Sequence, residues 1–145
     1  MIAEAKLATL ARLQGEILRQ CGSGHPEWYA ETLFAAAYDG VLAPTNHPSF
    51  DMRTERWGTV QVKCRVDGTD TTQNRANFKN YRIGDFDHAG IVLFERTFHI
   101  KGAVVLPCVD VLSLVRPAGH VKWQDAASHP RAIVVTSQLR AISGE

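Results

Sequence analysis

The sequence predicts an α/β domain in which a mixed central β-sheet is flanked by helices. Apolar residues recur at helical spacing in 2–20 and in 26–38. Apolar and polar residues alternate along 48–53 and again along 59–66, which is the period of a β-strand. Residues 90–95 form a nearly continuous apolar run, typical of a central strand buried on both faces.

The bulk properties predict one domain spanning residues 1–145. A chain of 145 residues can build a single substantial core. Its hydrophobic content of 45% and charged content of 21% are those of an ordinary soluble protein. No apolar run approaches a membrane span, and the N-terminus lacks the layout of a signal peptide. Three cysteines without a CxxC pair indicate neither a disulfide framework nor structural zinc, so we expect a cytoplasmic protein.

Two helices are expected to open the chain. The first spans residues 2–20 and ends before Gly22, and it would cover the sheet or make a dimer contact. The second begins near Pro26, a favoured first-turn residue, and runs to about Tyr38. Glu31 lies beside its apolar stripe. Such a residue is either a boundary glutamate at the edge of a buried face or a functional carboxylate.

A β-hairpin is predicted over residues 48–66, after a short strand at 41–43 and a turn-rich connection that contains His47. If the hairpin loop has three residues (55–57), Asp51 stands opposite Gln61 on the same face. A loop one residue shorter or longer inverts that relation. Burying Phe50 and Met52 with the valines of the second strand requires the three-residue loop. Lys63 then shares a face with Gln61, two residues away.

Beyond the hairpin, residues 67–80 are expected to form a long polar loop, of a kind that is either functional or mobile. In it, Phe78 or the following Tyr81 could stack on a nucleic-acid base. Strands are predicted at 90–95, 97–106, 120–123 and 132–136. Helical segments are predicted at 107–115 and 138–142.

The charge is unevenly distributed along the chain. The net charge is only +1, which argues against a protein that coats nucleic acid. Residues 53–82, however, carry a local excess of +4, and the rest of the chain sums to −3. A basic sector around a phosphodiester site fits a nucleic-acid substrate, although an ordinary solvated hairpin and loop would look the same.

The expected cluster of Asp51, Gln61 and Lys63 suits metal-assisted phosphodiester hydrolysis. Carboxylate and amide oxygens are the hard ligands that Mg²⁺ and Mn²⁺ prefer. Such an ion polarises a phosphoryl oxygen and lowers the pKa of a bound water. A neighbouring ammonium can orient the water or stabilise developing negative charge.

These residues resemble a known family. Pro48-x-x-Asp51 followed by Gln61-Val62-Lys63 is similar to the motif of the PD-(D/E)XK nucleases, in the variant with Gln at the (D/E) position. The order of helix with Glu31, hairpin, apolar strands and helix resembles the restriction-endonuclease-like core over residues 26–115. The whole chain, including its leading helix, also resembles a small bacterial branch of that superfamily.

The resemblance implies a Mg²⁺- or Mn²⁺-dependent endonuclease. Asp51 and Gln61 would hold the metal with help from Glu31, and Lys63 would position or activate the water. Arg65 could bind the scissile or a neighbouring phosphate, and Arg75 and Lys79 could contact the phosphate backbone. DNA is expected as substrate by family analogy alone.

The substitution by Gln61 leaves alternatives open, since it removes one negative charge from the expected metal site. The chain could be a catalytically inactive relative that binds nucleic acid or a protein partner. Asp51 and Lys63 could also form an ordinary surface ion pair. A homodimer would supply the two sites needed to cut both strands, and a partner could supply specificity, because no base-reading element is recognisable.

Overall fold

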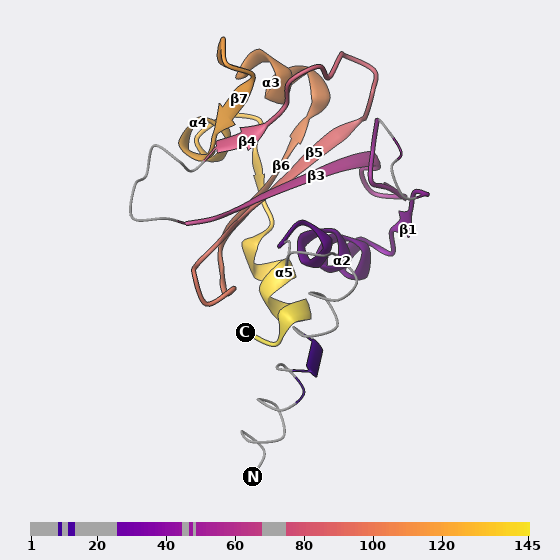
Figure 1. The fold of residues 1–145 in the computed structure, drawn as a ribbon. Helices are drawn as coiled ribbons and strands as arrows, with labels where there is room; N and C mark the ends of the chain where they lie inside the picture. Colours follow the sequence, from indigo (N-terminus) through magenta and orange to yellow (C-terminus); the bar gives the residue numbers. More distant parts are fainter. Residues whose placement is uncertain (1–8, 10–11, 14–25, 45–46, 48, 68–74) are drawn as a thin grey trace.

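A six-stranded sheet organises the fold (Figure 1). The computed structural model describes residues 9, 12–13, 26–44, 47, 49–67 and 75–145. The strands of the main sheet are β1 (Val41–Leu42), β2 (Met52–Thr54), β3 (Gly58–Val66), β5 (His88–Phe94), β6 (Ile100–Pro107) and β8 (Ile133–Val134). A second, two-stranded sheet pairs β4 (Arg75–Asn77) with β7 (His120–Lys122). The described helices are α2 (Pro26–Tyr38), α3 (Cys108–Ser113), α4 (Trp123–Ala127) and α5 (Thr136–Ser143).

The main sheet is mixed but mostly antiparallel. Its strand order is β1-β2-β3-β5-β6-β8, and β3 and β5 are the parallel pair. Parallel neighbours need a crossover connection, which here runs over residues 67–87 and contains β4. The sequence therefore predicted the coarse class correctly, an α/β fold with a mixed sheet flanked by helices.

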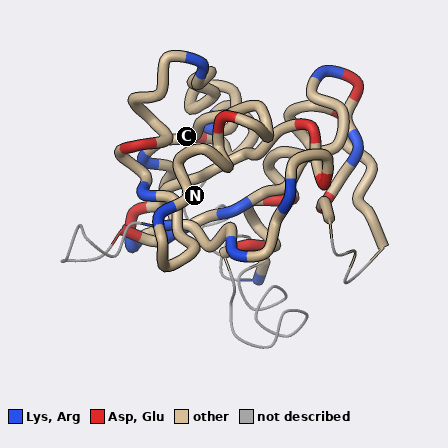
Figure 2. Tube along the Cα trace, turned by 90° about the horizontal axis from the view of Figure 1, so that it is seen from above, with Lys and Arg blue, Asp and Glu red and all other residues tan. Residues whose placement is uncertain are grey.

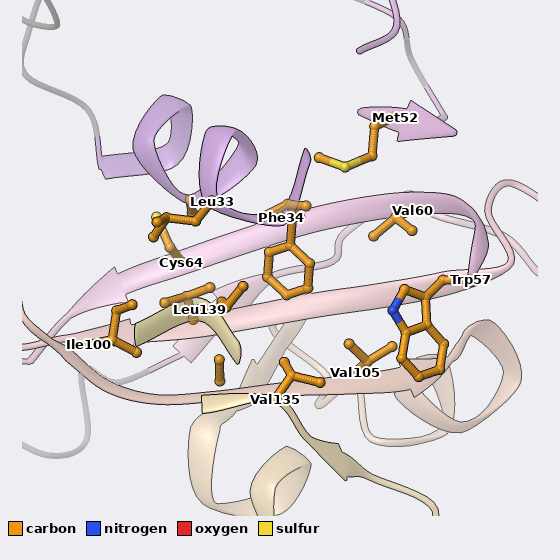
Figure 3. Close-up of a cluster of buried hydrophobic side chains, with 14 of the residues drawn as sticks. Leu33, Phe34, Met52, Trp57, Val60, Cys64, Ile100, Val105, Val135 and Leu139 are labelled. Carbon is orange, nitrogen blue, oxygen red and sulfur yellow. The ribbon is translucent and has the colours of Figure 1, made fainter. Parts of the chain in front are cut away.

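Two apolar cores lie on opposite faces of this sheet. On one face, α2 and α5 pack against side chains such as Val60, Val92 and Val105 (Figure 3). On the other face, the β4–β7 sheet, α3 and α4 cover side chains such as Ala89, Ile91 and Leu106 (Figure 1). Because β5 and β6 are covered on both sides, their sequences are almost uninterrupted apolar runs.

Local signals predicted most elements of the described chain. The helix expected at 26–38 has those bounds, and the later strands lie within a few residues of their predicted positions. The predicted loop at 67–80 was wrong in part, because residues 75–77 form β4. Helix α4 was not predicted. Of the first predicted helix, residues 9, 12 and 13 are helical, and the rest lies outside the described residues.

The three-residue hairpin loop is confirmed. Thr54 pairs with Gly58, and Met52 pairs with Val60. Gly58 has a φ of +70°, a conformation that glycine adopts without steric cost. A Cβ atom there would lie 2.2 Å from Oδ2 of Asp87, so the position also lacks room. The same Asp87 oxygen accepts the backbone N–H of Thr59 at 2.9 Å, which fixes the hairpin tip to the start of β5.

Helix α2 approaches the sheet closely at Gly90. The Phe34 ring is fully buried there, and a Cβ on Gly90 would lie 2.6 Å from Cζ of that ring. This contact sets the distance between α2 and β5 and so the position of the whole helix, including Glu31. No helix in the described part of the chain is long and apolar enough to cross a membrane.

We expect Gly90→Ala to destabilise the fold by about 1–3 kcal/mol, because the added methyl group overpacks a filled core. Phe34→Leu should also destabilise the protein, through loss of apolar contact. The double variant should lose less than the sum of the two, since the smaller side chain makes room for the methyl group. Urea denaturation of the four proteins measures the coupling. Strict additivity would show that the Phe34 ring does not limit the approach of α2.

Candidate metal-dependent phosphodiester site

Asp51 lies where β2 separates from β3. Its backbone N–H donates to the carbonyl of Val60 at 2.9 Å, and its Oδ2 accepts the backbone N–H of Val62 at 2.7 Å. The two bonds reach the residues on either side of Gln61. The carboxylate therefore takes the place that a backbone carbonyl would have in a continued ladder. Its position is fixed by the main chain of β3.

The expectation that Phe50 and Met52 share a face was wrong. Met52 lies in the core beneath α2, whereas Phe50 lies in the core on the opposite face of the sheet. The chain bends at Asp51, and regular strand structure begins only at Met52. Strict alternation therefore does not extend back through Asp51. The register of Met52 with Val60 nevertheless follows the apolar pattern, as predicted.

Glu31 reaches this point from α2. When protonated, its carboxyl group donates a hydrogen bond to that of Asp51, so the two acidic side chains are in contact. Burial, followed by the negative charge of Asp51 and by this hydrogen bond, raises the pKa of Glu31 to about 7. Two carboxyl groups in contact share a proton when no cation is present to neutralise them.

Burial is also the main cause that raises the pKa of Asp51. The N–H donated by Val62, the hydrogen bond from Glu31 and the charge of Lys63 act in the opposite direction without cancelling it. Both carboxyl groups are therefore harder to ionise than exposed ones. Such a site favours an added cation.

Lys63 is the basic residue whose positive charge acts on both carboxyl groups. Its charge lowers the pKa of Glu31 and that of Asp51. Its Nζ lies 5.3 Å from the centroid of the Tyr81 ring, a cation–π distance. Tyr81 belongs to the apolar cluster on the face opposite α2. The ammonium group thus lies beside an aromatic ring while its charge acts on the acidic pair.

Gln61 is buried, with 5% of its surface exposed. It occupies β3 between the two residues that Asp51 binds. An amide carries no net charge, so its burial costs far less than that of a carboxylate. This environment accounts for glutamine here in physical terms, since a third buried acid would add to the repulsion between Asp51 and Glu31.

The donor set fits Mg²⁺ or Mn²⁺. It contains the carboxylates of Glu31 and Asp51, which are hard oxygen donors, and Gln61 lies opposite Asp51 in the register of β2 with β3. The N–H and C=O of one strand residue point to the same edge, so the Val62 carbonyl faces the same side as the N–H bound by Asp51. Among the residues described, no cluster of three or more His, Cys, Asp or Glu side chains could hold a metal. Any metal here therefore depends on two acids with amide or carbonyl help.

A cysteine near the pair has a different character. Cys64 is buried beneath α2, and burial is the main cause that raises the pKa of its thiol to about 12. The thiolate is the nucleophilic form of cysteine, and at neutral pH this side chain is a thiol. Cys64 is therefore a core residue, and the chemistry of the site depends on oxygen and nitrogen groups.

The three expected backbone-contact residues lie near β4. Arg65 is exposed at the end of β3, and its Nε donates to the carbonyl of Arg75 at 2.6 Å. Lys79 is exposed just after β4. The suggestion that Phe78 stacks on a base was wrong, because its ring is only 1% exposed and packs in the core. Arg65 and Arg75 are therefore joined, while Lys79 lies further along the same segment.

His47 is exposed, and its ring is held by contacts with the residues that follow it. Its Nδ1 accepts the backbone N–H groups of Ser49 and Phe50 at 3.3 and 3.4 Å. Its ring lies 4.2 Å from that of Phe50. These contacts fold the chain just before Asp51. His47 thus shapes the approach to the site.

No protein-family model matches the chain, and no curated protein matches it at a significant level.

Three contributors to the site region were not found from the sequence. The backbone N–H of Val62 fixes Asp51, Tyr81 flanks Lys63, and Lys122 lies opposite Arg75 on the second sheet. The hairpin register places Asp51 opposite Gln61 and so beside Val62, the next residue of β3. The other two depend on the path of the chain after β3, for which no local pattern exists.

The raised pKa of Glu31 predicts a pH-dependent stability. The folded state binds this proton more tightly than the unfolded state, so the stabilisation is complete below the ordinary pKa of 4.5 and is lost as the pH rises through about 7. Glu31→Gln cannot ionise and should show no such loss. In metal-free buffer, its melting temperature relative to wild type should therefore rise across this interval.

Glu27→Gln is the matched control, because Glu27 is exposed one turn earlier on α2. It should shift the profile much less. Parallel profiles of Glu31→Gln and wild type over the whole interval would contradict the contact between Glu31 and Asp51.

Proposed function

We propose that this chain is a divalent-metal-dependent nuclease of the PD-(D/E)XK type that hydrolyses phosphodiester bonds, with DNA as substrate. The observation that carries the proposal is the contact between the Glu31 and Asp51 carboxyl groups, with Lys63 acting on both. A pair of acidic groups beside a lysine suits a metal-assisted attack on a phosphate. The resemblance of the hairpin motif to that family supports the same reaction class.

Asp51, Glu31 and Gln61 are the proposed metal ligands, with the Val62 carbonyl as a main-chain donor. When bound, Mg²⁺ or Mn²⁺ would supply Lewis-acid polarisation of the phosphate and a more acidic water. Asp51 is the ligand with the least freedom, because its other interaction is a 2.7 Å bond to the main chain. Glu31 provides the second carboxylate that Gln61 does not. Two carboxylates are within the number that commonly bind Mg²⁺.

Lys63 is the proposed residue that orients the attacking water and stabilises negative charge on the phosphate. The water oxygen forms a bond to phosphorus while the bond from phosphorus to one bridging oxygen breaks. One proton of the water stays on the new phosphate monoester, and the other ends on the released hydroxyl group. Tyr81 restricts the ammonium to one region of the site, which reduces the entropy lost when it engages the substrate.

Partners follow from the reaction. Cleaving both strands of a duplex requires two sites, which a homodimer would supply. The described residues include no separate unit for reading bases, so a partner protein or the shape of the substrate would provide specificity.

Metal binding should stabilise the folded protein. With Mg²⁺ or Mn²⁺ at a hundredfold excess over Kd, linkage gives about 2.7 kcal/mol, which raises Tm by several degrees in a protein of this size. Asp51→Asn keeps an acceptor for the Val62 N–H but loses the charge, and its Tm should be insensitive to the metal. Differential scanning fluorimetry with and without metal measures the shift.

Asp85→Asn is the control, because Asp85 also accepts a backbone N–H, from Arg82 at 2.8 Å. Its metal response should equal that of wild type. The same small response in all three proteins would mean that Asp51 does not bind the ion.

Cleavage of plasmid and single-stranded DNA with Mn²⁺ tests the reaction. Lys63→Ala should lower the rate by about 10²–10³-fold, the scale for losing one group that stabilises the transition state. Lys101→Ala removes a lysine that pairs with Asp67 on another part of the sheet, and it should cleave like wild type. Timed gel assays give both rates.

Cleavage that survives in Lys63→Ala would place the activity elsewhere or in a contaminant. Absence of cleavage by a wild type that still binds DNA would favour the second candidate, an inactive nuclease-fold module. That candidate is favoured by one observation, the buried uncharged Gln61 where the family motif has an acid.

A further inference from the structure

The two-stranded sheet of β4 and β7 presents a polar outer row. Its register pairs Arg75 with Lys122 and Asn77 with His120, while Ala76 and Val121 between them are buried in the core. Because strand side chains alternate, Arg75 and Lys122 stand side by side on the outer face. We call β4 and β7, together with the attached Arg65, the basic ribbon.

The basic ribbon is unusual in its charge. Lysine and arginine are interspersed with acidic residues over most of the trace (Figure 2). In contrast, residues 75–82 and 116–122 contain basic residues and no Asp or Glu. Lys101, Arg116 and Arg131 each have an acidic partner. Among the described residues, no ion-pair partner is found for Arg75 or Lys122.

Two like charges placed directly opposite on neighbouring strands destabilise a sheet. The β4–β7 pairing spans only three residue pairs, so it has few other contacts to offset this repulsion. A fold that keeps such a pair gains stability when an anion binds across it. Arg75 and Lys122 therefore place two cationic groups where a phosphate or a similar anion would relieve their repulsion.

Arg65 connects this site to the candidate catalytic residues. Its Nε donates to the Arg75 carbonyl at 2.6 Å, so β3 and β4 are held together at this point. Arg65 follows Lys63 by two residues on the same face of β3, a separation of about 6.6 Å by the rise of a strand. The cations of Lys63, Arg65, Arg75 and Lys122 thus follow one another away from the acidic pair.

Lys79 lies at the other end of the ribbon. Gly119, with a φ of +89°, allows the backbone to pass so closely that a Cβ there would lie 2.8 Å from Cβ of Lys79. The Lys79 stem is therefore packed against the turn before β7, and its ammonium extends to solvent. It lies in the turn that follows β4.

We propose that the basic ribbon binds the phosphate backbone of the nucleic acid whose scissile phosphate lies at Asp51 and Lys63. This rests on the proposed function for its ligand, a nucleic acid, but not on catalysis. The contacts are to phosphate and do not read sequence, because the ribbon offers guanidinium and ammonium groups, and Phe78, which follows β4, is buried. The alignment of the row with the phosphodiester site favours a polynucleotide over an acidic peptide.

Fluorescence anisotropy with labelled duplex and single-stranded oligonucleotides in EDTA tests this without cleavage. Each lost phosphate contact should reduce the slope of log K against log salt by about 0.9 for duplex or about 0.7 for a single strand. Lys122→Glu and Arg75→Glu should each bind several-fold more weakly at low salt and show these smaller slopes. Lys122→Glu replaces a repulsive pair by an attractive one, so its Tm should be unchanged or higher, which excludes misfolding as the cause.

Arg96→Glu makes the same charge change at an exposed turn residue between β5 and β6, and it should bind like wild type. Equal affinities and slopes for the Arg75, Lys122 and Arg96 variants would overturn the proposal. Competition by poly-glutamate as effective as that by DNA would also overturn it, in favour of a general polyanion surface.

Different experimental outcomes would refute the proposed role of the basic ribbon and the proposed nuclease activity. Lys63→Ala should keep most of the binding while losing cleavage. Binding that weakens in the ribbon variants without any cleavage by wild type would support the ribbon and refute the nuclease. Cleavage by wild type with ribbon variants that bind and cut normally would do the reverse.

Discussion

The hydrogen bond from the Val62 N–H to the Asp51 carboxylate is the contact on which the candidate site depends. A β-strand that ends beside a longer neighbour leaves backbone groups without a ladder partner, and a buried unpaired N–H costs free energy. The side chain of Asp51 takes over that role where β2 departs. The same interaction gives the Val62 N–H of β3 a partner and marks the end of the ladder between β2 and β3. It also holds a carboxylate where the two strands separate. Glu31 can then reach it from α2, and Lys63 acts on the resulting pair.

The two cores explain how a small domain supports this arrangement. One core fixes α2 through the contact between Phe34 and Gly90, and so fixes Glu31. The other core holds Tyr81, which borders Lys63. The acidic pair and the lysine therefore depend on packing from opposite faces of the same sheet. Electrostatic preorganisation of this kind is set by apolar packing, because charged groups alone would repel or collapse onto one another.

Sequence reasoning succeeded where structure follows from short-range pattern. The helix at 26–38 and the strand at 59–66 are encoded by periodicity, and the hairpin register follows from burying Met52 with the valines. It failed at Phe50 because a bend at a polar residue interrupts alternation without any turn residue to announce it. It missed β4 because three residues pair with a strand more than forty positions later. The proximity of Glu31 to Asp51 was suggested by a family resemblance, since no spacing rule relates a helix residue to a hairpin twenty residues on.

The tip of the hairpin carries no chemistry, yet Gly58 and Asp87 tie it to β5 with no space for a larger residue. Counting along the strands from this fixed end determines which side chain meets Val62. Deleting a single amino acid between Thr54 and Gly58 would exchange the faces of residues 51 and 52. The carboxylate of Asp51 would then enter the apolar core, and the thioether of Met52 would lie beside Glu31. Turn length therefore determines the geometry of the acidic pair as much as the acids themselves do, and natural variation should preserve it even where Glu55 and Arg56 are replaced.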